Sequence, residues 1–133
     1  MKHSLVFFCI ILFSILWQTS LGQLPKGKSI TFKVNTEFKS YYPLDSIKNI
    51  TLTNWKGEHI LSQKAKLTFI NTLKKYTYGG NYAHTKPGHT NCKIVFENGA
   101  VLTFYSNSES DIIIWNGEDN TFIPNGKMNF ENF

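Results

Sequence analysis

The chain lacks arginine. All 14 of its basic residues are lysine, against 9 acidic residues, and the formal net charge is +5. Arginine makes two-pronged contacts with phosphate and guanine that lysine cannot make. The composition therefore argues against a dedicated nucleic-acid or phosphate-binding protein, and we expect no nucleic-acid partner. Mild positive charge favours solubility and a weak attraction to acidic surfaces.

The chain also lacks a hydrophobic run of about 20 residues, the length that spans a bilayer as a helix. Its longest run, Leu5–Trp17, follows the basic start Met1–His3 and precedes small residues at Ser20–Gly22. That order is typical of a cleaved secretory signal peptide, and an uncleaved anchor is the alternative. We expect residues 1–22 to direct export to the periplasm or the extracellular space. Residues 23–133 should then form a single domain without a transmembrane segment.

Cysteine is scarce, with only Cys9 and Cys92 present. Cys9 would leave with the signal peptide, so Cys92 would have no intramolecular partner and no disulfide is expected. A chain of this length can bury well over half of its unfolded surface and needs no covalent cross-link. The alternation that places Cys92 in line with Ile94 and Phe96 predicts that its thiol points into the core.

The stretch around Asn98-Gly99 organises the C-terminal half of the chain. Asn-Gly between two β-branched hydrophobic runs predicts a hairpin with a two-residue type I′ turn. That turn would pair Phe96 with Val101 and Val95 with Leu102. The pairing predicts one core-facing set of residues, namely Cys92, Ile94, Phe96, Val101 and Tyr105. It assigns Val95, Leu102 and Phe104 to the other face, beside Lys93 and Glu97.

One helix is predicted, at Gln63–Tyr76, with Ser62 as its N-cap. Its hydrophobic stripe includes Phe69 and Leu73, while most of its lysines lie off the stripe. Gly79-Gly80 is interpreted as the signal that ends the helix.

Alternating patterns predict half-buried strands on both sides of the helix. These strands are Ser29–Val34, Ile47–Trp55, Glu58–Ile60, Asp111–Trp115 and Thr121–Ile123, in addition to the hairpin. The fold class that follows is α+β in a single small domain. A C-terminal meander of three to four strands and the N-terminal strands would form an antiparallel sheet packed against one helix.

The least regular segment, Tyr78–Asn91, mixes tyrosine and histidine with glycine and asparagine. Tyrosine gives a large contact area at low entropic cost, and glycine and asparagine give an adaptable backbone. We therefore predict a non-catalytic domain that contacts a protein or a cell-envelope component through the Tyr78–His89 loop. The predicted binding residues are Tyr78, Tyr82, His84, Lys86 and His89. No cofactor is expected, and the oligomeric state is left open.

Two alternatives rest on Cys92. A small exported enzyme could use its thiolate with His59, His84 or His89 as the base. A zinc or copper site could be formed by His84, His89 and Cys92, although this spacing matches no strong metal motif. The chain carries no other local catalytic signature.

Trp55 and Trp115 are the remaining residues of interest. If both lay on the sheet face away from the helix, they would form an exposed aromatic patch suited to a sugar or a protein. The alternative is that both belong to the core.

Overall fold

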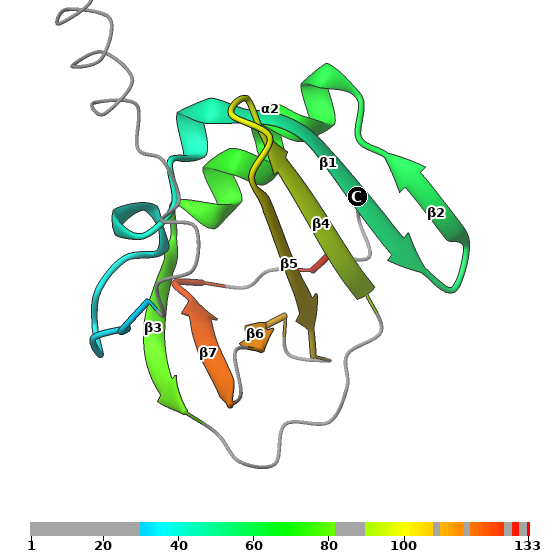
Figure 1. Ribbon diagram of the computed structural model, residues 1–133. Coiled ribbons are helices and arrows are strands. Elements are labelled where there is room, and N and C mark those ends of the chain that lie inside the picture. The colour runs from blue at the N-terminus through cyan, green and yellow to red at the C-terminus, as the bar shows by residue number, and fades with distance from the viewer. Residues whose placement is uncertain (1–29, 82–89, 108–109, 116–117, 127–128, 131–132) are drawn as a thin grey trace, which may run out of the picture.

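Seven antiparallel strands form one sheet in the computed structural model, and α2 packs on one face of it (Figure 1). The structure describes residues 30–81, 90–107, 110–115, 118–126, 129–130 and 133. The elements are η1 (Phe38–Ser40), η2 (Leu44–Ser46), β1 (Ile47–Asn54), β2 (Gly57–Ile60), α2 (Gln63–Leu73), β3 (Tyr76–Asn81), β4 (Thr90–Phe96), β5 (Val101–Ser106), β6 (Ile112–Trp115) and β7 (Asp119–Pro124). In space the strands follow the order β2-β1-β4-β5-β6-β7-β3. The predicted α+β class is confirmed, with a larger sheet than expected.

Helix α2 begins where the sequence predicts. The Ser62 side chain accepts a hydrogen bond from the Ala65 amide at 3.3 Å, which satisfies one of the amides left unpaired in the first turn. Phe69 and Leu73 are fully buried against the sheet. The helix ends at Leu73 rather than at Tyr76, because Tyr76 joins a strand. No helix in the part of the chain that the structure describes is both long and apolar enough to cross a membrane.

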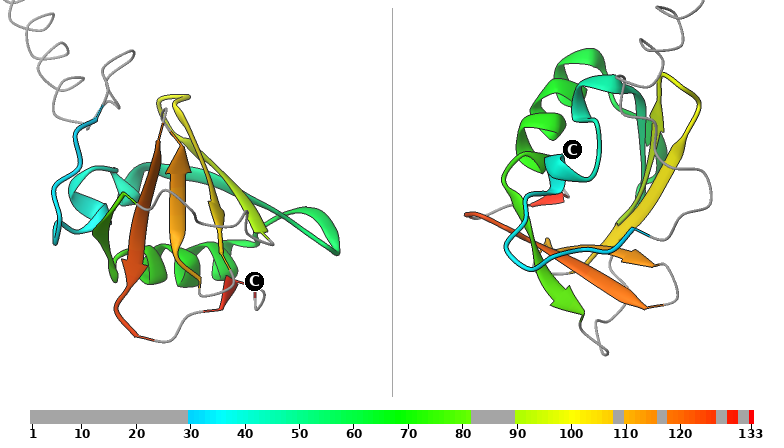
Figure 2. Two further views of the ribbon diagram at one scale, coloured as in Figure 1. Left: turned by 90° about the horizontal axis from the view of Figure 1, so that it is seen from below. Right: turned by 60° about the vertical axis from the view of Figure 1, so that its left-hand side comes forward.

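The sheet curls around α2, so that the core lies between the helix and the concave side of the strands (Figure 2). Aromatic rings fill much of this space. The Phe122 and Phe38 rings have centroids 5.1 Å apart, and Phe69 lies 5.3 Å from Phe130 near the C-terminus. Phe130 is buried, so this part of the C-terminal tail docks on the core. Figure 2 also shows the β1–β2 hairpin projecting beyond the body of the sheet.

The hairpin between β4 and β5 forms, but the predicted register is wrong by one residue. The observed pairs include Val95 with Val101 and Ile94 with Leu102. The loop holds three residues, because Gly99 adopts a left-handed φ of 81° while Asn98 does not, and a type I′ turn needs both. The Asn98 side chain instead accepts a hydrogen bond from the Ala100 amide at 2.9 Å.

This shift exchanges the two faces of β5. Leu102 and Phe104, which were assigned to the outer face, are buried in the core. Val101 is about half exposed and Tyr105 is half-buried on the opposite face. Cys92 remains on the core side as predicted. A one-residue slip in a strand always moves its side chains to the other face.

Strand β3 was not predicted, and the Gly79-Gly80 pair belongs to it instead of ending the helix. A Cβ atom at position 79 would overlap the side chain of Ile123 on the neighbouring strand β7, which explains the glycine there. Gly80 has a φ of 125° at the point where the β3–β7 register shifts. Glycine inside a strand often marks a β-bulge or a site where a neighbouring group approaches the backbone closely, and Gly80 and Gly79 match these two cases.

The predicted strand at Ser29–Val34 is also wrong over the residues that the structure describes, because 30–34 form no strand. The chain turns instead at Lys33–Thr36, with Asn35 in the left-handed region at a φ of 64°. The turn is hydrogen-bonded to β3. The Asn35 amide donates to the Tyr78 carbonyl, and the Tyr78 amide donates to the Thr36 carbonyl, each at 2.9 Å. The outer edge of β3 is therefore partly covered, and Phe32 packs against the core while Val34 is 55% exposed.

Candidate functional site: a groove on the open face of the sheet

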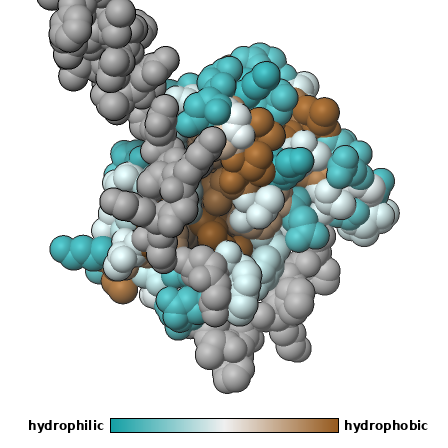
Figure 3. Space-filling model, viewed as in Figure 1, coloured by the Kyte–Doolittle hydropathy of each residue, from teal (hydrophilic) through white to brown (hydrophobic). Residues whose placement is uncertain are grey.

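One face of the sheet carries no helix formed by the residues that the structure describes, and we call it the open face. Its residues alternate with the core residues along each strand, as the pairing register requires. A run of hydrophobic side chains crosses the middle of this face, with hydrophilic groups on either side (Figure 3). Val101 and Ile60 are among the exposed hydrophobic residues of the face, at 52% and 68%. Because such residues are costly to expose together, this face is a candidate contact surface.

The open face is hollowed where two strands part. Strand β6 pairs with β7 at four positions but with β5 at only two, Tyr105–Ile113 and Ser106–Ile112. The end of β6 at Trp115 therefore leaves β5 and follows β7. The opening between them uncovers the edge of Phe104, which otherwise belongs to the core.

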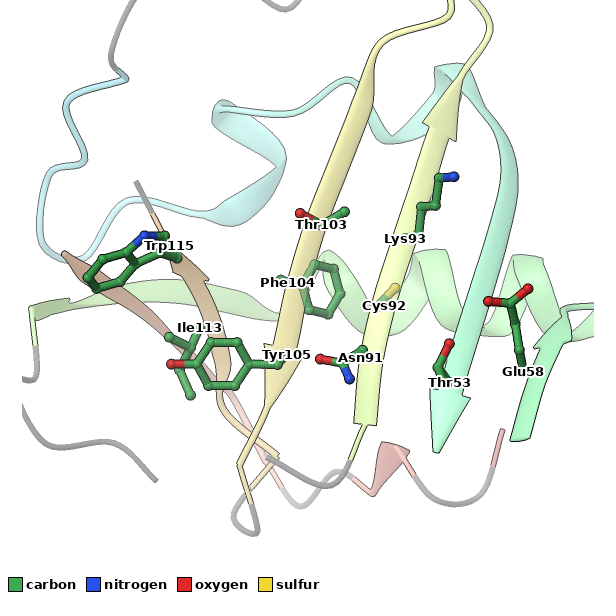
Figure 4. A pocket seen from close by; sticks show the side chains of 10 residues that line it. All are labelled: Thr53, Glu58, Asn91, Cys92, Lys93, Thr103, Phe104, Tyr105, Ile113 and Trp115. Carbon is green, nitrogen blue, oxygen red and sulfur yellow. The ribbon is translucent and has the colours of Figure 1, made fainter. Parts of the chain in front are cut away.

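A groove of about 360 Å³ occupies this hollow and extends across β4 and β1 toward β2 (Figure 4). That volume lies within the usual range for small-ligand sites, which begins at about 300 Å³. The lining residues are Thr53, Glu58, Asn91, Cys92, Lys93, Thr103, Phe104, Tyr105, Ile113 and Trp115. Five of them form one continuous row of directly paired residues across five strands, in the order Glu58, Thr53, Asn91, Tyr105, Ile113.

Trp115 stands at one end of the groove and is the most exposed of its aromatic residues. Its side chain is 67% exposed, although its backbone is fixed by pairing with Asp119. Trp55 is equally exposed, at 77%, but it lies at the tip of the β1–β2 hairpin with Lys56 over its ring at 5.1 Å. Trp55 does not line the groove. The two tryptophans are thus both outside the core, as one reading of the sequence proposed, but they do not form a single patch.

Hydrogen bonding holds one wall of the groove in place. The Tyr105 hydroxyl donates to a carboxylate oxygen of Asp119 at 3.0 Å, which ties β5 to β7 across the shorter strand β6. Ile113 is fully buried beneath this wall. An aromatic ring whose hydroxyl is anchored presents a fixed surface to a ligand, so less ordering is required on binding.

The polar side chains of the groove are mixed in sign and type. Lys93 and Glu58 bring opposite charges and lie at the end away from Trp115 (Figure 4). Thr103, Thr53 and Asn91 supply neutral donors and acceptors. The groove therefore has no excess of either charge, which suits a ligand rich in hydroxyl or amide groups better than a polyanion.

Cys92 touches the groove, but its side chain is only 3% exposed and belongs to the hydrophobic core. Burial raises the pKa of the thiol well above its ordinary value, so the thiolate is strongly disfavoured. His59 lies on the core side too, and its Nε2 donates to the Phe133 carbonyl at 3.1 Å. Leu52 pairs with both Cys92 and His59, so a whole strand separates the thiol from this imidazole. This arrangement argues against a Cys92–His59 pair for catalysis.

The predicted binding loop is shorter than expected, because Tyr78 lies in β3. Tyr78 is 7% exposed, and its hydroxyl donates to the Asn120 side chain at 3.1 Å in the interior. It is therefore a structural residue. The other four predicted binding residues, Tyr82, His84, Lys86 and His89, lie outside the described residues.

The same holds for the proposed metal site, because both of its histidines fall in the segment 82–89. Across the part of the chain that is described, His, Cys, Asp and Glu form no group of three that could hold a metal ion.

The sequence identified Trp115 but missed its neighbours. Asn91, Thr53 and Thr103 belong to no sequence motif. They lie together because β1 pairs with β4, which is distant in sequence, and β4 pairs with β5. The available signal for the face was the alternation of Ile113 and Trp115 with the core residues Ile112 and Ile114, although Ile113 is itself fully buried.

No family model, no curated protein and no solved structure matches this chain. The geometry of the open face therefore carries the functional argument.

Proposed function

We propose that the protein is an exported, non-catalytic binding domain whose ligand occupies the groove on the open face. The observation that carries the proposal is the position of Trp115, a largely exposed indole on a strand backbone paired with Asp119, at the end of a mixed polar groove. Ligand sites typically combine a hydrophobic or aromatic surface with a few fixed polar groups. The buried thiol of Cys92 favours binding over nucleophilic catalysis.

The chain offers a matched pair of variants to test this proposal. Trp115→Ala removes the groove indole, and Trp55→Ala removes an equally exposed indole from the hairpin tip. Each immobilised protein is exposed to the envelope and medium fractions of the cells that produce it. We expect at least one component to be retained by the parent protein and by Trp55→Ala and lost with Trp115→Ala.

Identical retention by all three proteins would contradict a ligand in the groove. Because both side chains are mostly exposed, both variants should keep the melting temperature of the parent within a few degrees. A large fall in the melting temperature of Trp115→Ala would instead assign its indole a structural role.

A contact through residues 82–89 remains part of the proposal. This segment leads directly into Thr90 and Asn91, and Asn91 lines the groove. A partner bound in the groove would therefore meet this end of β4. The double variant Tyr82→Ala/His84→Ala should weaken capture of the same component without changing the melting temperature. Unchanged capture would remove the segment from the binding surface.

Export is proposed from the N-terminal sequence. Residues 1–29 lie outside the described structure, so the order of basic start, hydrophobic run and small residues is the support. The mature chain should be recovered outside the cytoplasm with Gln23 as its first residue. N-terminal sequencing of the exported protein tests this, and recovery of an intact Met1 form in the membrane would support the uncleaved anchor.

A further inference from the structure

We infer that the ligand of the groove is a linear oligosaccharide, with one pyranose ring stacked on the indole of Trp115. This inference rests on the proposed binding function and specifies its ligand. A pyranose whose substituents are equatorial presents a flat face of C–H bonds, which packs against the electron-rich face of an aromatic ring. Trp115 is 67% exposed on a backbone paired with Asp119, so much of its indole surface is open to such a contact.

The polar residues of the groove complement hydroxyl groups. Each sugar hydroxyl is both a donor and an acceptor, and the groove supplies both roles. The Asn91 amide and the hydroxyls of Thr53 and Thr103 can donate and accept, whereas the Lys93 ammonium only donates and the Glu58 carboxylate supplies acceptors. One positive and one negative charge give no net attraction for a polyanion.

The same geometry disfavours an extended peptide. A peptide commonly adds to a sheet by pairing its backbone with a free strand edge. Most of the groove instead crosses β1 and β4, which pair with a neighbouring strand on both sides, whereas β5 pairs with β6 only at Tyr105 and Ser106. The backbone groups of β1 and β4 already bond to their neighbours, so the backbone of a peptide lying across these two strands would depend on side chains alone.

The length of the groove favours an oligomer over a single sugar. Its lining residues come from five neighbouring strands, from Glu58 on β2 to Trp115 on β6. With about 4.8 Å between strands, this corresponds to roughly 19 Å. A ligand of several linked rings can contact Trp115 and the Lys93–Glu58 end at once, whereas one ring cannot.

The test uses cellotetraose and chitotetraose as probes, because both are linear chains of equatorially linked pyranoses. Isothermal titration compares the parent protein with Trp115→Ala, Trp115→Phe and Trp55→Ala. We expect at least one tetraose to bind the parent protein, with affinity lowered at least about tenfold in Trp115→Ala, the scale of a lost aromatic stacking contact. Trp115→Phe should lie between them, and Trp55→Ala should stay within about twofold of the parent.

Glucose and N-acetylglucosamine serve as single-ring controls, and each should bind at least about tenfold more weakly than its tetraose if the full groove is used. Failure of both tetraoses to bind, or equal affinities for Trp115→Ala and Trp55→Ala, would overturn the saccharide inference.

The capture experiment distinguishes failure of the proposed binding function from failure of the saccharide inference. A component that depends on Trp115, survives protease digestion and releases monosaccharides on acid hydrolysis of its glycosidic bonds supports the saccharide. A component that depends on Trp115 and is destroyed by protease would retain the binding function and refute the saccharide. If no component depends on Trp115, both proposals fail.

Discussion

Raising the pH should destabilise this protein through the thiol of Cys92. In the folded state the thiol is buried in the core, and burial raises its pKa well above the ordinary value. In the unfolded chain it ionises near its ordinary pKa of about 8.5. Above that pH the unfolded state therefore holds fewer protons than the folded state. The contribution of Cys92 to stability is fully present below about pH 8.5 and is lost as the pH rises.

The size of the effect follows from this linkage. Each pH unit above the unfolded pKa lowers the free energy of unfolding by about 1.4 kcal/mol for a group that stays neutral when folded. At pH 10.5 the loss from Cys92 is about 2.7 kcal/mol on the same basis. Burial also raises the pKa of Tyr42 and Tyr76, so these phenols add to the loss above about pH 10.

The assay is urea unfolding between pH 7 and pH 10.5 for the parent protein and for Cys92→Ala. At pH 7 the variant should be less stable by about 1–2 kcal/mol, because it leaves a small cavity in the core. Its stability should fall less steeply with pH, so the two curves should cross near pH 9.5. Parallel curves across this range, or rapid reaction of the native thiol with Ellman's reagent, would refute the buried position of Cys92.

Three substitutions test other details of the core and sheet by urea unfolding at pH 7. Thr121→Val should stabilise the protein by about 1 kcal/mol, because the Thr121 hydroxyl is buried without a hydrogen-bond partner among the described residues; destabilisation would mean that the hydroxyl is satisfied. Gly79→Ala should destabilise it by about 1–3 kcal/mol through overlap with Ile123, and by clearly less in an Ile123→Ala background; equal costs in both backgrounds would exclude that overlap. Tyr76→Phe should cost about 1–3 kcal/mol, because the Tyr76 hydroxyl donates to the buried Ser110 carbonyl at 2.5 Å; a neutral result would mean that this bond adds nothing to stability.

Elements with strong local signals could be predicted from the sequence. Helix α2 begins after Ser62 because one side chain and one hydrophobic stripe specify it. Strands β1, β2 and β6 follow from alternation and were placed within a residue or two. Ile50 and Leu52 of β1 lie in the core, and so does Cys92 of β4, whose direction was predicted.

The hairpin register could not be obtained from its turn sequence. Asn98-Gly99 is compatible with a two-residue turn and with the observed three-residue loop. Burial decides between them, because only the observed register places Leu102 and Phe104 opposite Ile94 and Cys92 on the core side. Comparing how many hydrophobic residues each register places on one face would have favoured the observed register.

Strand β3 was missed for a related reason. Gly79-Gly80 is a strong local signal for a helix end, but the packing of Ile123 against Gly79 is visible only once β3 and β7 are neighbours. The groove is likewise a product of topology. It exists because β6 leaves β5 to follow β7, which no local pattern in Ile112–Trp115 indicates.

Ligand contact on the open face is tested most directly by amide chemical shifts of the labelled protein during titration with cellotetraose and chitotetraose. The expected result is a saturable change in the chemical shifts of the Trp115 indole N–H and of the Asn91 and Thr103 amides. The amide chemical shifts of α2 should not change. Shifts confined to α2 or to the hairpin tip at Trp55, or no shift at saturating probe, would contradict the assignment of the groove.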